Sequence, residues 1–410
     1  MSHLGTIKPT AARAAEPELH ATGLFVVLCL LVGGGTDKGI GSDLVLQVMA
    51  LPFIFAFVMQ FPSRALDWPV TLFIAAVLGL MVVQLIPTFG LNGAPFLVTV
   101  DAGRSLDSLV MVLAWIGVFH AVTQMKSGSQ AVLMVYVLAG MLLNFLFSFI
   151  QFASSAFADA AQFLPYTLNA GFFENENHLS ALFYICAPII IVLARRIGIW
   201  FLAIPLLAVL LGFQFVIGSK AGLVLIAFSI IVSYAVLSDQ RWVSRGVLAL
   251  TLGGGAYLVW HFLPAWWGTG GALSRSVFAE RAIQAALDHL PFGVGFGNFQ
   301  LIYPSYETPA IIVDKYVNHA HNDYLELFLE GSVGAVLLLL AYFALLARQC
   351  FKGALIDMQK AAVVGIIVIS IHSLVDYPLR TLALGIVFAI LNALVFSSHS
   401  KNMKIHDEAS

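Results

Sequence analysis

Charged residues are scarce in this sequence: Asp, Glu, Lys and Arg make up 10% of the 410 residues, and hydrophobic residues make up 60%. The mean hydropathy of +0.93 lies outside the range of soluble globular domains. A chain with so little charge cannot cover its apolar side chains with a polar surface. The composition therefore predicts an integral membrane protein.

Two further shortages exclude other classes. The sequence has three Cys, and Cys29, Cys186 and Cys350 show neither a disulfide framework nor zinc-ligand spacing. The formal net charge of −2 provides no basic face that could neutralise the phosphates of a nucleic acid. We expect no nucleic-acid partner and no cysteine-based metal site.

Hydrophobic runs of membrane-spanning length recur along the whole chain, which predicts an all-α polytopic membrane protein with a single membrane domain over 1–410. We expect about twelve transmembrane helices. Their approximate ranges are 23–36, 44–60, 69–87, 107–123, 131–154, 179–194, 198–217, 221–237, 246–263, 327–347, 360–375 and 381–397.

The loops between these runs carry an asymmetric charge, and Lys and Arg are retained on the cytoplasmic side of membrane proteins. With both termini cytoplasmic, as tails over 1–22 and 398–410, thirteen of the twenty basic residues fall inside. These are Lys8, Arg13, Arg64, Lys126, Arg195, Arg196, Arg241, Arg245, Arg348, Lys352, Lys360, Lys401 and Lys404. The outer set is Lys38, Arg104, Lys220, Arg275, Arg281, Lys315 and Arg380. The N-terminal stretch has no cleavable signal-peptide pattern, so we expect the first helix to direct insertion.

One long segment between hydrophobic runs, about 264–325, is mixed in composition and rich in turn residues and aromatics. We expect it to form a folded subdomain on the outer side, because its aromatic content argues against disorder. Within it, 275–290 predicts a helix that ends before Pro291. The Gly-x-Gly-x-Gly that follows is not a dinucleotide fingerprint, because it follows a helix instead of opening one.

Five motifs lie between residues 175 and 380. They are DHLPFGVGFGNF at 288–299, HAHNDYLE at 319–326, NENHL at 175–179, GSKAG at 218–222 and HSLVDYPLR at 372–380. With these motifs the chain resembles the Wzy/WaaL superfamily of bacterial O-antigen ligases and polysaccharide polymerases, from about residue 170 to 385. It departs from the family where Lys220 replaces the usual Arg, and where Ala279 stands in place of a common aromatic residue after Arg275.

This resemblance implies an inner-membrane glycosyltransferase that takes a glycan from an undecaprenyl diphosphate carrier on the periplasmic face. The acceptor is either a lipid A core sugar, for an O-antigen ligase, or a second carrier-linked glycan, for a polymerase of O-antigen or exopolysaccharide. The motifs do not separate these two activities. A transporter of polyprenyl-linked glycan is a remote alternative, since it would place ionisable residues inside the spans.

A diphosphate leaving group needs fixed cations, which stabilise the developing negative charge and could replace a metal. The candidates are Lys220, Arg275, Arg281 and Arg380, all on the outer face. The alternatives are structural: Arg281 could pair with Glu280, and Arg380 with Asp376. Because Arg275 and Arg281 are six residues apart, we expect only one of them to face the site.

The acceptor hydroxyl must lose a proton, and His is the usual base near neutral pH. We predict His321 as the catalytic base, with His319 as a second candidate or an orienting neighbour. The His-x-His pair lacks a third metal ligand at suitable local spacing, so we predict no metal and no cofactor. Asn177, His178, Asn322 and Tyr324 are candidate lining residues, although helix capping is an alternative role for Asn177, as it is for Asn175.

Overall fold

The computed structural model describes residues 17–36, 41–63, 66–86, 88–89, 95–96, 98–155, 169–238, 240, 245–246, 249, 253, 275–307, 317–353 and 355–397. The described part is a helical bundle with one short antiparallel strand pair, β1 (Thr88–Phe89) and β2 (Pro95–Phe96). The long helices are α1 (Pro17–Val32), α2 (Gly41–Gln60), α3 (Trp68–Leu85), α4 (Ala102–Gln124), α5 (Ser127–Ser155), α6 (Glu176–Arg196), α7 (Trp200–Ile217), α8 (Lys220–Leu237), α12 (Asp323–Phe351), α13 (Asp357–His372) and α14 (Leu382–Phe396).

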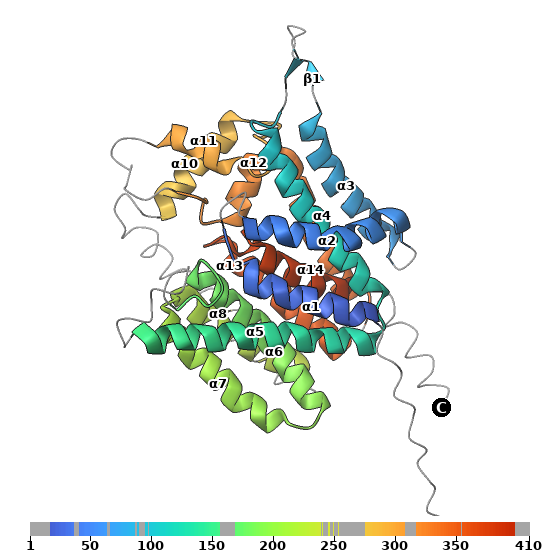
Figure 1. Cartoon of the computed structure of the whole chain (residues 1–410), viewed down its shortest axis with the longest axis vertical. Helices are drawn as coiled ribbons and strands as arrows, with labels where there is room; N and C mark the ends of the chain where they lie inside the picture. Colours follow the sequence, from blue (N-terminus) through green and yellow to red (C-terminus); the bar gives the residue numbers. More distant parts are fainter. Residues whose placement is uncertain are drawn as a thin grey trace, which may run out of the picture.

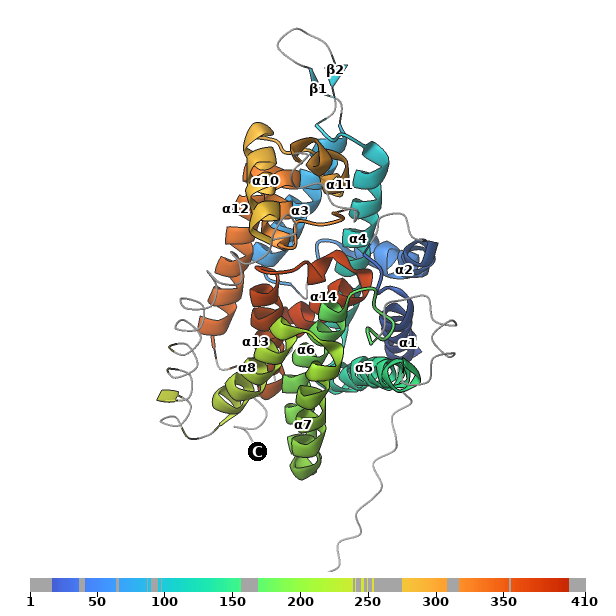
Figure 2. The same cartoon turned by 90° about the vertical axis from the view of Figure 1, so that its left-hand side faces the viewer.

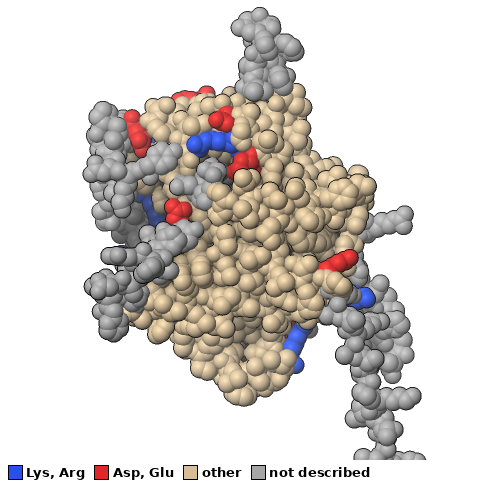
Figure 3. Space-filling view, in the orientation of Figure 1, with Lys and Arg blue, Asp and Glu red and all other residues tan. Residues whose placement is uncertain are grey.

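These helices form a bundle around α6, α13 and α14 (Figures 1 and 2). α14 packs against α1, α4 and α13, and α6 packs against α8 and α13. In α6, 83% of the most apolar 18-residue window is buried, whereas only 22% of that window is buried in α2. The outward-facing apolar side chains of helices such as α2 leave a broad surface with few charged residues (Figure 3). Such a surface suits a hydrocarbon environment.

The all-helical architecture is confirmed, and eight described helices are long and apolar enough to cross a membrane. α1 and α14 are shorter apolar helices, and α13 has 16 residues. The described residues therefore support a multi-pass membrane protein but do not establish twelve spans. The expected span at 246–263 and the tail at 398–410 lie outside the described residues.

The first helix begins earlier than the sequence suggested. α1 starts at Pro17, inside the segment expected as a tail over 1–22, and ends at Val32 instead of 36. Proline suits the first turn of a helix because that turn needs no N–H from it, and Glu18 complements the helix dipole there. Gly33 and its neighbouring glycines end the helix.

The bundle separates the charged residues into two groups. At one end, Asp67 pairs with Arg348 and Lys352, and Arg195 binds the carbonyl of Leu237 at the end of α8. At the other end lie Arg104, Lys220, Arg275, Arg281 and Arg380, together with the loops that carry His319 and His321. The described members of the two predicted loop sets thus lie at opposite ends.

The predicted subdomain contains α10 (Arg275–Asp288), α11 (Phe299–Ile302) and the 3-10 helix η2 (Tyr303–Tyr306), which cover the start of α12 (Figure 1). Its Gly-x-Gly-x-Gly allows close approach of two backbones. Gly293 has φ +78°, and a side chain there would collide with the carbonyl of Glu330. The motif thus seats the subdomain on α12.

Candidate functional site

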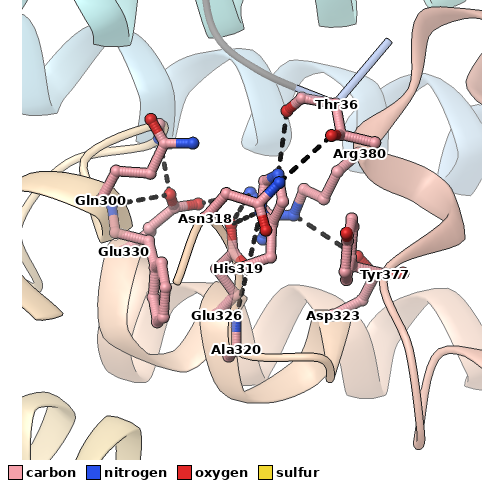
Figure 4. A network of polar contacts seen from close by, with 12 residues as sticks. Thr36, Gln300, Asn318, His319, Ala320, Asp323, Glu326, Glu330, Tyr377 and Arg380 are labelled. Carbon is pink, nitrogen blue, oxygen red and sulfur yellow. Dashed lines mark hydrogen bonds and ion pairs between the residues drawn. The ribbon is translucent and has the colours of Figure 1, made fainter. Parts of the chain in front are cut away.

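A buried ion cluster lies under the start of α12 (Figure 4). Arg380, in the 3-10 helix η3 (Pro378–Arg380), places Nη1 2.7 Å from Glu330 Oε2 and 3.4 Å from Glu326 Oε1. Its Nε lies 3.4 Å from Asp323 Oδ1. The three carboxylates are all at most 4% exposed. A guanidinium shared by three buried carboxylates is committed to them, so the structure favours a structural role for Arg380 over diphosphate binding.

The same carboxylates hold the neighbouring loops. Glu330 accepts from the backbone N–H of Gly297 at 2.8 Å, and Asp323 accepts from the Ser373 hydroxyl at 2.7 Å. The expected partner of Arg380, Asp376, is not among the residues that it contacts. The chain around Pro378 is not α-helical, so residues four apart do not face each other.

His319 belongs to this cluster and is 1% exposed. Its Nδ1 lies 2.9 Å from Glu326 Oε1, and its Nε2 lies 2.9 Å from the Thr36 carbonyl oxygen. Both partners are acceptors, so both ring nitrogens donate and the ring is an imidazolium. Burial lowers the pKa of His319, but the Glu326 carboxylate outweighs burial and raises it overall. His319 is therefore unsuited to be the base, and neither ring nitrogen is free for a metal shared with His321.

His321 pairs with Asp376 and not with the carboxylates of the ion cluster. Its side chain is 27% exposed, and Nδ1 is 3.2 Å from Oδ1 of the fully buried Asp376. A neutral His321 that donates from Nδ1 leaves the lone pair of Nε2 free, and no described residue hydrogen-bonds to Nε2. Its φ of +50° is a left-handed conformation that non-glycine residues rarely adopt. Such strain persists where the surrounding contacts enforce it, often at functional sites.

The sequence analysis missed Asp376 as a candidate site residue, because it treated Asp376 only as a possible partner for Arg380. Asn177 Nδ2 donates to Asp376 Oδ2 at 2.5 Å. Burial alone raises the pKa of Asp376, but the hydrogen bond from His321 and the nearby imidazoles of His372 and His178 hold it well below its ordinary value. Asp376 is thus a carboxylate that fixes the orientation of His321.

α10 covers His321 with an aromatic ring flanked by cations. Phe278 stacks on the His321 imidazole, with ring centroids 5.7 Å apart. Three residues along a helix turn a side chain by about 60°, so Arg275 and Arg281 lie on either side of Phe278. The expectation that only one of them faces the site stays a prediction. Arg281 lies 3.6 Å from Glu280 and donates to Gln284, whereas the described residues show no ion pair for Arg275.

The start of α8, next to Lys220, is linked to the same region by a chain of hydrogen bonds. Lys220 is exposed and follows the N-cap Ser219, whose hydroxyl donates to Asn177 Oδ1 at 2.7 Å. Asn177 in turn binds Asp376, so α8 and His321 are connected through two side chains. Among the described residues, Lys220 has no ion pair.

The remaining predicted lining residues are mostly structural. Asn322 caps α12 through its side-chain Oδ1, which accepts from the backbone N–H groups of Tyr324 and Leu325. The capping alternative was expected for Asn175 and Asn177: Asn175 does cap α6, whereas the Asn177 side chain binds Asp376. Tyr324 donates to the Ser370 carbonyl at 2.7 Å. The His178 ring is fully buried and lies nearly perpendicular to the ring of Tyr377. Among the described residues, neither of its ring nitrogens has a hydrogen-bond partner.

A cavity of about 340 Å³ opens between α3, α4, α12 and α14. Its walls are mainly apolar and include Phe73, Ile116, Leu338 and Phe388. Its polar lining consists of Asp323, Tyr324, Ser373 and Arg380. Asp323 and Tyr324 lie two and three residues after His321 in the sequence.

A comparison with protein-family models gives no match, and a comparison with curated proteins gives none either. The resemblance to the O-antigen ligase superfamily rests on the motifs quoted from the sequence.

The ion cluster predicts that Arg380→Ala loses folded protein, because Asp323 and Glu330 lose their buried cation and Glu326 keeps only His319, at a cost of about 3–5 kcal/mol. Arg380→Lys should keep more folded protein. Arg348→Ala is the matched control, because that Arg is 42% exposed and its pair with Asp67 contributes little. Thermal unfolding in detergent measures all three, and a stable but inactive Arg380→Ala would instead support a role in substrate binding.

The raised pKa of His319 predicts a pH dependence of stability. The folded state binds a proton more tightly than the unfolded state, whose pKa is about 6.5. The stabilisation is thus complete below about pH 6.5 and is lost as the pH rises through the folded-state pKa. At pH 6, roughly half a unit below the pKa of the unfolded state, we expect His319→Gln to unfold at a lower temperature than wild type. The unfolding temperature of His319→Gln should also change less with pH. Parallel curves for the two proteins would contradict the imidazolium assignment.

Proposed function

We propose that this chain is an O-antigen ligase-like membrane glycosyltransferase. It moves a glycan from undecaprenyl diphosphate to an acceptor sugar, with the lipid A core as the proposed acceptor. The observation that carries the proposal is the His321–Asp376 pair, which leaves the Nε2 of His321 free next to Phe278 of α10, the helix that carries Arg275 and Arg281. The resemblance in sequence supports the same activity.

In the proposed reaction, Nε2 of His321 removes the proton from the acceptor hydroxyl. The hydroxyl oxygen forms a bond to the anomeric carbon of the donor glycan. The bond from that carbon to the diphosphate oxygen breaks, and its electron pair leaves with the undecaprenyl diphosphate. Asp376 stabilises the imidazolium that forms on His321.

The leaving group gains negative charge, which nearby cations stabilise. Lys220 and Arg275 suit this role because no described carboxylate occupies either of them. Arg281 is 25% exposed, and its partner Glu280 is 3.6 Å away and largely exposed. Arg281 can therefore also stabilise the charge of the leaving group, from the other side of Phe278. Arg380 contributes indirectly, by holding the loop that positions Asp376.

The carrier also has a long isoprenoid tail that must stay in an apolar environment. We assign part of this tail to the cavity between α3, α4, α12 and α14, because its walls are mainly apolar and its polar lining includes Asp323 and Tyr324, just after His321. We further propose that the site faces the periplasm of a bacterial inner membrane, with both termini in the cytoplasm. The support is the excess of Lys and Arg in the loops at the opposite end.

The glycan profile of a deletion strain tests this function. Loss of a ligase leaves uncapped lipid A core while long chains accumulate on the carrier. Single repeat units on the carrier would instead identify a polymerase. An unchanged profile of both lipopolysaccharide and exopolysaccharide would contradict either activity.

The base assignment predicts that His321→Ala lowers turnover by about a hundredfold or more, with little change in donor affinity because the cations remain. Asp376→Asn should also lower turnover strongly, since an amide can donate to His321 Nδ1 and move the ring proton to Nε2. Asp357→Asn, at the opposite end of the bundle, is the control. Transfer and donor binding are measured separately in nanodiscs, and normal transfer by His321→Ala would exclude it as the base.

A second set of variants examines the charge on α8. Lys220→Arg should retain most activity, because charge is kept, whereas Lys220→Ala should lose most of it at a normal protein level. Lys360→Ala, at the other end of the bundle, should behave like wild type. The measurement is transfer at several donor concentrations, and full activity of Lys220→Ala would remove this residue from the mechanism.

The cavity assignment predicts different results at two adjacent positions of α12. Leu338 lines the cavity, whereas the neighbouring Leu337 is 61% exposed on the outside of the bundle. Leu338→Trp should fill part of the cavity and weaken carrier binding by about tenfold. Leu337→Trp should bind as wild type does. Equal binding by both variants would place the tail elsewhere.

A further inference from the structure

Asp376 has a second histidine on the side away from His321. His372 ends α13 and is fully buried, with Nε2 3.7 Å from Asp376 Oδ2. His321 contacts the other oxygen, Oδ1. The Asp376 carboxylate therefore lies between the partly exposed imidazole of His321 and the fully buried imidazole of His372.

Tyr184 determines where His372 carries its proton. The fully buried hydroxyl of Tyr184 lies 2.6 Å from His372 Nδ1, and the described residues offer it no other partner. A buried hydroxyl that does not donate costs about 1–3 kcal/mol, so it donates to Nδ1. A neutral His372 that accepts at Nδ1 has its proton on Nε2, and this N–H faces Asp376.

Burial favours a neutral His372 and outweighs the neighbouring Asp376 carboxylate, which favours the charged ring. From α10, Arg275 is the cation whose field reaches this ring, and it disfavours a second positive charge there. The other groups that face Asp376 are Asn177 and His178 of α6, Tyr377 beside it, and the backbone N–H of Asp323, which donates to the Asp376 carbonyl. The separation of 3.7 Å is longer than a hydrogen bond but short enough for a charge–dipole attraction.

We propose that Tyr184 and His372 are positioning residues, which direct an N–H at Oδ2 of Asp376 and so keep Oδ1 turned toward His321. No proton moves along this chain; its effect is to fix the carboxylate and, through it, the tautomer of His321. The proposal rests on the proposed function, because it gives His321 its role as base. Neither residue touches substrate.

Nitrogen-15 NMR of histidine-labelled protein tests this arrangement without reference to transfer. The signals are assigned by His372→Gln and His321→Gln. We expect the proton of neutral His372 on Nε2 and that of neutral His321 on Nδ1. In Tyr184→Phe, which removes one oxygen atom, His372 should lose its single tautomer and His321 should shift toward the Nε2–H form. A wild-type His372 with its proton on Nδ1, or a His321 tautomer unaffected by Tyr184→Phe, would overturn the proposal.

Transfer kinetics supply a second test. His372→Leu and Tyr184→Phe should lower kcat by about tenfold with KM for the donor unchanged, as is common for residues that orient a functional group. His372→Gln should restore most of kcat, because its amide nitrogen can donate from nearly the position of Nε2. Full turnover in His372→Leu would contradict the proposal. Failure of the base assignment itself is separate, since it appears as normal transfer by His321→Ala.

Discussion

The pairing of Arg380 with three buried carboxylates is the constraint on which the rest of the site depends. Asp323, Glu326 and Glu330 lie along one side of the first turns of α12 and pair with Arg380. This cluster binds three loops directly and a fourth, at 33–36, through His319. A buried cluster of this kind is stable only when its members are all present, because each unpaired charge carries a large desolvation cost. The positions of the loops at 33–36, 295–299, 317–322 and 373–381 are therefore fixed together.

This arrangement explains how His321 is held in a strained conformation. His319, two residues earlier, is anchored as an imidazolium between Glu326 and Thr36, and Asn322 on its other side caps α12. Between two fixed neighbours, the backbone of His321 adopts a φ of +50° and its ring meets Asp376. The two histidines of the His-x-His motif thus have different environments: His319 is buried between two acceptors, whereas His321 is partly exposed beside Asp376.

The sequence was sufficient to predict the helical architecture, because apolar runs of about twenty residues have few alternatives. It also gave His321 and the cations of α8 and α10 as candidate site residues. It could not identify Asp376 as the partner of His321, because the two residues are brought together only by the packing of α12 against the loop after α13. The four-residue spacing of Asp376 and Arg380 suggested an ion pair, but α13 ends at His372, so the α-helical spacing does not apply to these two residues. The flanking of Phe278 by Arg275 and Arg281 likewise depends on which side of α10 meets His321.

A structure of the protein in nanodiscs with undecaprenyl diphosphate, determined by electron cryo-microscopy, would test the central claim most directly. We predict that the diphosphate lies between Lys220, Arg275 and Arg281 within reach of His321, and that the isoprenoid chain enters the cavity between α3, α4, α12 and α14. Arg380 should remain paired with its carboxylates. A diphosphate bound at the opposite end of the bundle, or bound by Arg380 in place of the carboxylates, would contradict the account.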